Sequence, residues 1–337
     1  MMPGRRVALW ALLLLALSSL CVLLGTAVGS HQGWEVWWSA TPDPVMQQIV
    51  WDIRLPRSLG AWLGGALLGL AGAMAQGLFR NPLADPYLLG SASGASLGVS
   101  LYLSLFGGSI LASSWLPRLG MTGAAFVGAV LAVVLTLALA RGVQQTLRLL
   151  LAGVVVGVVL GALASLVALF EPQVLQAMQG FMLGSTAFVG WISCGLMALA
   201  LLLSLAVAWV LARVLDALTL GEATAQSLGM PLRLARLLLV AAMSLATAAA
   251  VAQMGLIAFV GLAAPHAVRS LVRCTHGGVL LLSALMGGAL LLLADVLARG
   301  LLAPQDLPVG VLTAVLGGVY LLWRMKAANQ PASGGRA

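Results

Sequence analysis

The amino-acid sequence predicts an all-α, polytopic membrane protein: one domain, residues 1–337, built as a bundle of about ten transmembrane helices. Hydrophobic residues make up 61% of the chain and charged residues only 8%, whereas about 25% of the residues in a soluble domain are charged. The apolar residues form runs close to the ~20 residues that cross a bilayer as a helix. Several runs are dense in glycine, and small residues let transmembrane helices pack closely.

Ten apolar segments have the length and composition of membrane spans. The first follows Arg5 and Arg6, as a secretory signal would. Its apolar stretch is longer than the ~7–15 residues of such a signal, so we expect a first transmembrane helix. The predicted spans are 7–29, 58–79, 87–107, 120–140, 147–169, 189–211, 234–253, 256–272, 279–298 and 309–325.

The basic residues predict how these spans are oriented. With the N-terminus in the cytoplasm, all but four of the 17 Lys and Arg residues fall on the cytoplasmic side, as the positive-inside rule requires. The four on the outer side are Arg54, Arg57, Arg118 and Arg299. We therefore expect a multi-pass protein of the bacterial inner membrane with both termini in the cytoplasm.

A short internal similarity predicts two related halves. Arg54-x-x-Arg57 precedes the sequence AMAQGL at 73–78, and Arg233-x-x-Arg236 precedes VAQMGL at 251–256. The first arginine pair is expected on the outer side and the second on the cytoplasmic side. This fits two five-helix halves of inverted topology, an arrangement common in transporters.

The longest polar segment on the cytoplasmic side is 213–233. Leu218, Glu222 and Ala225 recur in it at helical spacing, and Gly229, followed by Met230 and Pro231, is a stop signal for a helix. We expect one or two short helices that lie along the cytoplasmic surface. Gly229 is expected to provide a turn that needs a positive φ angle.

The sequence excludes several kinds of chemistry. The single lysine, Lys326, has no glycine-rich loop before it, so the chain has no Walker A site for ATP and we do not expect an enzyme. Cys21, Cys194 and Cys274 are far apart and predict neither a disulfide framework nor a metal site. The basic residues are scattered singly between apolar runs, which argues against nucleic acid as a partner.

Ionisable residues are almost absent from the predicted spans. Secondary transporters keep such residues inside the membrane to couple transport to an ion gradient. Asp295 and Arg299 are the nearest, and their spacing of four residues predicts a pair across one helical turn. A chain without coupling groups and without an ATP site is expected to obtain its energy from a partner.

Four ordered segments resemble the FecCD family, the permeases of ABC importers for iron siderophores, heme and vitamin B12. They are RLPR at 54–57 with the glycine-rich run after it, RNPLADPYLLG at 80–90, GLIAFVGL at 255–262, and LPVGVLTA at 307–314. The resemblance covers nearly the whole chain. We expect its motif residues to be structural: Gln76, Asn81, Pro82, Asp85, Pro86, Gly90, Gly261, Pro265, His266 and Asp295.

This resemblance implies a homodimer with a translocation path on its two-fold axis, two cytoplasmic ATPase subunits that bind ATP and Mg²⁺, and a periplasmic substrate-binding protein. It implies no cofactor on this chain. Arg54, Arg57 and Arg299 are expected to act as rim charges that dock carboxylates of the binding protein. The segment 213–233 is expected to couple to the ATPase through Leu218, Thr219, Gly221, Glu222, Ala223, Ala225, Leu228 and Gly229.

The implied function is transport of a metal chelate, an iron siderophore or heme, by a type II ABC importer. The alternative cargo is vitamin B12 (cobalamin), and a third hypothesis is a secondary carrier that does not use ATP. Two departures from the family pattern keep the cargo open. Val319 and Tyr320 stand where many members have proline and phenylalanine, and the loop 274–278 differs from the charged turn of many members.

Overall fold

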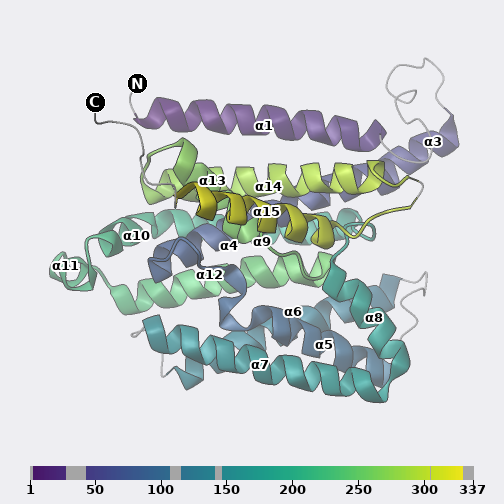
Figure 1. Cartoon of the computed structure of the whole chain (residues 1–337), viewed down its shortest axis with the longest axis horizontal. Helices are drawn as coiled ribbons and strands as arrows, with labels where there is room; N and C mark the ends of the chain where they lie inside the picture. The colour runs from purple at the N-terminus through teal and green to yellow at the C-terminus, as the bar shows by residue number, and fades with distance from the viewer. Residues whose placement is uncertain (1–2, 28–42, 107–114, 141–145, 304, 329–337) are drawn as a thin grey trace.

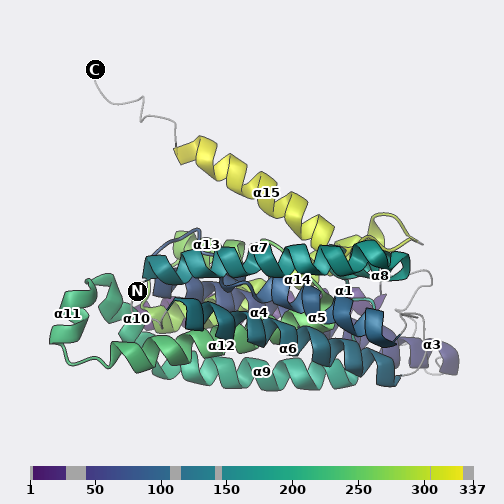
Figure 2. The same cartoon turned by 90° about the horizontal axis from the view of Figure 1, so that it is seen from below.

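The computed structural model describes residues 3–27, 43–106, 115–140, 146–303 and 305–328, and this part of the chain is helical without a β-strand (Figures 1 and 2). The elements are α1 (Pro3–Ala27), α3 (Pro44–Gln48), η1 (Ile49–Arg54), α4 (Leu55–Phe79), η2 (Pro86–Leu89), α5 (Ser91–Phe106), α6 (Trp115–Leu139), α7 (Thr146–Phe170), α8 (Pro172–Leu183), α9 (Trp191–Val210), α10 (Ala212–Thr219), α11 (Glu222–Ser227), α12 (Leu232–Met254), α13 (Val260–Leu271), α14 (His276–Gly300) and α15 (Val309–Ala328).

Each of the ten predicted spans corresponds to one of these helices, so the predicted fold class is confirmed. Within the described residues, seven helices are long and apolar enough to cross a membrane, and α5 and the apolar part of α15 are shorter. The remaining predicted span, 256–272, is wrong as a continuous helix. Only its second part is helical, in the 12 residues of α13, which extend about 18 Å against a hydrocarbon core of about 30 Å.

The non-helical backbone before α13 is bound by other parts of the chain. Gly255 ends α12 with a φ angle of 72°. The Leu256 N–H donates to the Phe181 carbonyl at 3.0 Å, and the Tyr87 hydroxyl donates to the Ile257 carbonyl at 3.1 Å. Irregular backbone at membrane depth requires such protein partners because lipid supplies none. Helix α8, which the sequence analysis did not predict, provides one of them.

Helix α4 runs through the middle of the bundle, between α12, α13 and α14 (Figure 1). The segment Pro44–Phe79, which contains α4, is 83% buried over its most apolar window, whereas Gly4–Ala27 in α1 is 17% buried. Lipid can cover apolar side chains as well as protein does, so the exposed apolar surface of α1 suits a helix at the edge of a membrane bundle.

Helices α4 and α14 approach closely because glycines face each other. A Cβ atom on Gly65 would lie 2.2 Å from the Gly287 carbonyl oxygen, and a Cβ on Gly287 would lie 2.3 Å from the Gly65 oxygen. One turn further along α4, a Cβ on Gly69 would lie 2.1 Å from the Ser283 oxygen. No side chain fits at these distances. The role that the sequence predicted for glycine, close helix packing, is therefore present at this contact.

The bundle has two ends, which we call the α3 end and the α11 end after the short helices found there (Figure 1). Helix α4 follows α3 and η1 and runs from the α3 end to the α11 end, whereas α12 follows α11 and runs the opposite way. Helix α14 is also antiparallel to α4. The opposite directions of α4 and α12 agree with two halves of inverted topology.

Candidate functional site

Two groups of charged side chains lie at opposite ends of α4 and α14. The α3-end cluster consists of Arg57, Asp295, Arg299 and Asp306. The α11-end cluster consists of Arg80, Asp216, Glu222, Arg236 and His276. Helix α4 has 25 residues and is therefore about 37 Å long. The same pair of helices thus carries polar groups at both ends of the bundle and an apolar contact between them.

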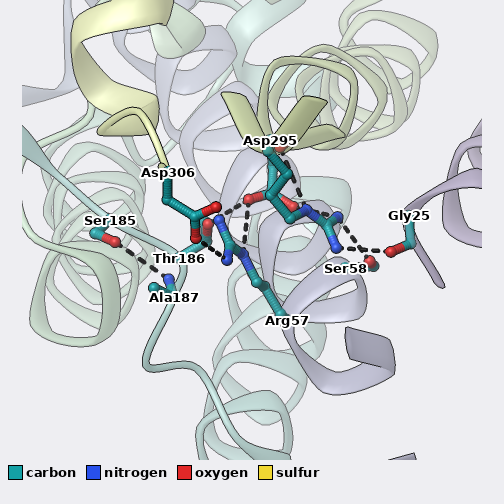
Figure 3. Close-up of polar contacts among 9 residues, drawn as sticks. Gly25, Arg57, Ser58, Ser185, Thr186, Ala187, Asp295 and Asp306 are labelled. Carbon is teal, nitrogen blue, oxygen red and sulfur yellow. Dashed lines mark hydrogen bonds and ion pairs between the residues drawn. The ribbon is translucent and has the colours of Figure 1, made fainter. Parts of the chain in front are cut away.

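Asp295 is the centre of the α3-end cluster (Figure 3). Its side chain is 0% exposed and accepts from Arg57 Nε at 3.1 Å and from Arg299 Nη2 at 2.6 Å. The Thr186 hydroxyl, between α8 and α9, donates to the same carboxylate. The pair predicted across one turn of α14 is therefore confirmed. A buried carboxylate requires such donors because burial removes its water.

Arg299 ties α14 to α1 and α4. Its Nη1 donates to the Gly25 carbonyl at 2.7 Å, and its Nη2 donates to the Ser58 hydroxyl at 3.0 Å. Arg54 makes a similar contact, with Nη1 donating to the Thr26 carbonyl at 3.0 Å. Both arginines therefore hold the last turn of α1 against the helices that begin or end at the α3 end.

The expectation that all three docking arginines are rim charges is wrong as to their exposure. Arg54 is 7% exposed and Arg299 is 5% exposed. Both bond to carbonyl groups of their own chain, because a buried guanidinium needs acceptors for its N–H groups. Arg57 bonds to an exposed partner: its Nη1 donates to Asp306 at 2.6 Å, and the Asp306 side chain is 46% exposed. Docking by these residues remains a prediction.

The α11-end cluster fastens the predicted coupling segment to the bundle. Glu222, the first residue of α11, pairs with Arg236 of α12 at 2.6 Å and with Arg80, just after α4, at 3.5 Å. Arg236 is 5% exposed, so its pair is better shielded from water than the pair with Arg80. Glu222 is therefore a fixed contact between α11, α12 and α4.

Asp216 of α10 provides a second attachment. Its carboxylate accepts from the backbone N–H of His276, the first residue of α14, at 2.9 Å, and pairs with Nδ1 of the same residue at 2.7 Å. A carboxylate suits the N-terminus of a helix, where backbone N–H groups have no partner within the helix. Asp216 therefore connects the coupling segment to the helix that carries Asp295 at its other end.

The sequence predicted one or two short helices in the coupling segment, and the structure has two, α10 and α11. Gly221 and Gly229 both have positive φ angles, 105° and 74°, so the predicted glycine turn is confirmed at Gly229. The predicted coupling residues differ in how much of each residue is exposed. Leu218 and Ala225 are buried, Gly221 and Glu222 are half-buried, and Thr219, Ala223, Leu228 and Gly229 are exposed. The exposed face of this segment is where a partner would make contact.

The predicted motif residues lie at turns and close helix contacts. Gln76 donates to the Leu262 carbonyl at 3.2 Å and accepts from Arg269, which joins α4 to α13. Asn81 and Asp85 accept hydrogen bonds from the backbone N–H groups of Leu83 and Tyr87. A Cβ atom on Gly261 would lie 2.7 Å from Pro86. His266, next to Pro265, packs edge-on against Tyr320.

Two other motif residues lie in the same loop region between α4 and α5. Pro82 is exposed, and Gly90 has a φ angle of 81° where the chain enters α5. Burial raises the pKa of the Asp85 carboxyl, and the bond from the Tyr87 N–H partly opposes this effect. The contacts of these residues are consistent with the structural role expected from the sequence, which remains a prediction.

Several members of both clusters were not predicted from the sequence, above all Asp306 and Asp216. One signal could have found them: the chain has only nine acidic residues. In the described structure, Glu222, Asp295 and Asp306 form ion pairs with arginines, and Asp216 bonds to His276. In so apolar a chain, each carboxylate needs a reason to be present. Within the described residues, no group of three His, Cys, Asp or Glu side chains could hold a metal ion.

The chain is similar to known membrane transport proteins. The vitamin B12 import system permease protein BtuC of Escherichia coli O157:H7 is 38% identical over 325 residues, which cover 95% of this chain and 96% of that protein. A solved protein described as a metal-chelate type ABC transporter, in an inward-facing conformation, has a TM-score of 0.82 at 29% identity, over 94% of this chain and 98% of that chain. PsaBC from Streptococcus pneumoniae, at 19% identity and a TM-score of 0.54, shares the fold alone.

The pattern of the FecCD transport family matches residues 11–327. The match begins within α1 and ends within α15, so it includes both charged clusters and the helices that join them. The chain therefore belongs to the FecCD transport family.

Proposed function

We propose that this permease is the membrane-spanning subunit of a type II ABC importer that moves a metal chelate, an iron siderophore or heme, from the periplasm to the cytoplasm. It works as a homodimer in the bacterial inner membrane, with both termini in the cytoplasm. Two cytoplasmic ATPase subunits bind ATP and Mg²⁺ and supply the energy. A periplasmic substrate-binding protein delivers the chelate, and this chain itself catalyses no reaction.

One observation carries this proposal: the family match extends over residues 11–327 of a chain whose charged clusters lie at opposite ends of α4 and α14. An importer of this kind needs a contact for the substrate-binding protein on one side of the membrane and a contact for the ATPase on the other. Arg57, at the α3 end, can donate hydrogen bonds to a carboxylate of the binding protein. The segment α10–α11, at the α11 end, is anchored firmly enough by Glu222 and Asp216 to pass on a rigid-body movement.

Vitamin B12 is the second candidate cargo. The 38% identity to BtuC over 95% of the chain favours it, and the similarity to a metal-chelate type transporter favours the wider class. A pathway through an apolar bundle can pass more than one kind of bulky solute. If the binding protein selects the cargo, the permease does not need a tight binding site for it. The two cargoes are therefore separated by experiment.

The test is uptake by vesicles that contain the permease, its ATPase and its binding protein. Labelled heme, a ferric siderophore and cobalamin are supplied in turn, with ATP inside the vesicles. We expect ATP-dependent uptake of an iron chelate, and uptake of cobalamin alone would establish the second candidate. An ATPase variant that binds but does not hydrolyse ATP is the control. Uptake that continues with this variant under an ion gradient would establish a secondary carrier and overturn the proposal.

The Gly229→Val variant is expected to assemble but to show reduced ATP hydrolysis when the loaded binding protein is added. Gly229 has a φ angle of 74°, and a Cβ atom there meets nothing within 4 Å. The whole effect is therefore conformational, a strain of about 1–3 kcal/mol that the turn can relieve only by changing shape. The measurement is stimulated ATP hydrolysis by the purified complex.

Gly190→Val is the matched control. Gly190 precedes α9 with a φ angle of −111°, which valine adopts readily, and a Cβ there also meets nothing within 4 Å. This variant should keep full stimulation. Full stimulation in Gly229→Val as well would show that the turn after α11 has no part in coupling.

A further inference from the structure

Arg57 lies between two carboxylates of its own chain. Its Nε donates to Asp295 at 3.1 Å and its Nη1 donates to Asp306 at 2.6 Å. Figure 3 shows the guanidinium group between them. Its side chain is only 11% exposed. The residue expected to receive a carboxylate from another protein therefore already holds two.

The charges of the α3-end cluster are balanced within the subunit. Two guanidinium groups, on Arg57 and Arg299, face two carboxylates, on Asp295 and Asp306. A carboxylate that approaches this cluster thus meets no net positive charge from it. It would gain a strong contact with Arg57 only if one of the two carboxylates already present gave up its place.

The two carboxylates differ in how firmly they are held. Asp295 is 0% exposed, lies within α14, and also accepts from Arg299 and Thr186. The Asp306 side chain is 46% exposed and belongs to the loop between α14 and α15, and Arg57 is the one partner described for it. Removing Asp295 from the cluster would leave buried donors without an acceptor, which is costly, whereas Asp306 can turn to water. Asp306 is therefore the exchangeable partner.

We propose that Asp306 is an internal competitor for docking: in the free permease it occupies the edge of Arg57 that a carboxylate of the binding protein takes in the complex. This inference rests on the proposed function, because it assigns the docking carboxylate to the periplasmic binding protein. Docking exchanges one Arg57–carboxylate pair for another, so it adds little net charge attraction and selects for a partner that brings a carboxylate to this point.

The exchange also has a consequence within the subunit. The Asp306 contact ties the loop before α15 to the start of α4. Helix α15 leans away from the bundle toward its C-terminal end (Figure 2), although Tyr320 in its second half still packs against His266. In the loop before α15, the Leu307 N–H donates to the Ala298 carbonyl at 3.2 Å. Release of Asp306 removes the contact of this loop with Arg57.

The first test needs no partner. Phenylglyoxal modifies accessible guanidinium groups, and mass spectrometry of peptides from the purified permease reports the rate at Arg57. Asp306→Asn should raise this rate about two- to fivefold, the range expected when an exposed ion pair is lost. Asp52→Asn removes the same charge from an exposed residue at the same end of the bundle and should leave the rate unchanged. Equal rates in wild type and Asp306→Asn would overturn the proposal.

The second test measures docking of the periplasmic binding protein to the complete transporter, by the kinetics of association at low salt. Asp306→Asn should bind about two- to fivefold more tightly than wild type and than Asp52→Asn. In the Arg57→Ala background, Asp306→Asn should have no further effect, since the competition needs the guanidinium group. Weaker or unchanged docking by Asp306→Asn would overturn the inference while leaving the proposed function intact. A wild-type transporter that binds no periplasmic protein would overturn the proposed function itself, whatever the labelling shows.

Discussion

Replacement of Asp295 by asparagine is expected to destabilise the folded permease by about 3–5 kcal/mol, the usual consequence of removing one partner from a buried ion pair. Asparagine keeps the shape of the side chain but loses its charge. Arg299, which is 5% exposed, would then be buried without a carboxylate, and Arg57 would keep only Asp306. The measurement is thermal unfolding of the detergent-purified protein, monitored as the fraction of protein that stays monodisperse after heating.

Two variants test the explanation. Asp52→Asn, at an exposed position of the same end, should change the free energy of unfolding by no more than about 0.5 kcal/mol. The double variant Asp295→Leu/Arg299→Met removes both members of the pair and should recover much of the loss, because apolar residues often replace a buried pair without cost. A double variant less stable than Asp295→Asn would show that the hydrogen bonds of Arg299 to α1 and α4 matter more than its charge pair.

The second large effect is expected at the contact of α4 with α14. Gly65→Ala should destabilise the protein by about 1–3 kcal/mol, as overpacking does in other tightly packed interiors. The added Cβ would lie 2.2 Å from the Gly287 carbonyl oxygen, and a backbone atom moves away only if the helices separate. Because both helices carry the charged clusters, transport should fall together with stability.

Gly195→Ala is the matched control, since Gly195 also lies inside a helix, α9, and a Cβ there meets nothing within 4 Å. Alanine favours a helix by up to about 1 kcal/mol over glycine, so this variant should be as stable as wild type or more stable. The two substitutions are chemically identical and are expected to act in opposite directions. The same unfolding temperature for both would contradict the close approach of α4 and α14.

The sequence by itself determined that lipid surrounds this protein, and it determined most of the helices. Runs such as 58–79 are too long and too apolar for a water-soluble protein, and only 8% of the residues in this chain are charged. A chain in lipid must satisfy its backbone hydrogen bonds within each helix. Local signals were also sufficient for Gly229, whose turn follows a short helix, and for Asp295 with Arg299, which share one face of α14. These features depend on neighbours along the chain.

The tertiary structure alone decided which distant groups meet. The span 256–272 is apolar throughout, so composition predicts a helix, but Tyr87 and Phe181 bind the backbone there and permit a break. Arg57 and Asp306 are separated by 249 positions, and no local pattern joins them. In lipid an arginine and a carboxylate are each costly alone and tolerable as a pair, so the packing of α4, α14 and the loop before α15 determines whether Arg57 is open or occupied.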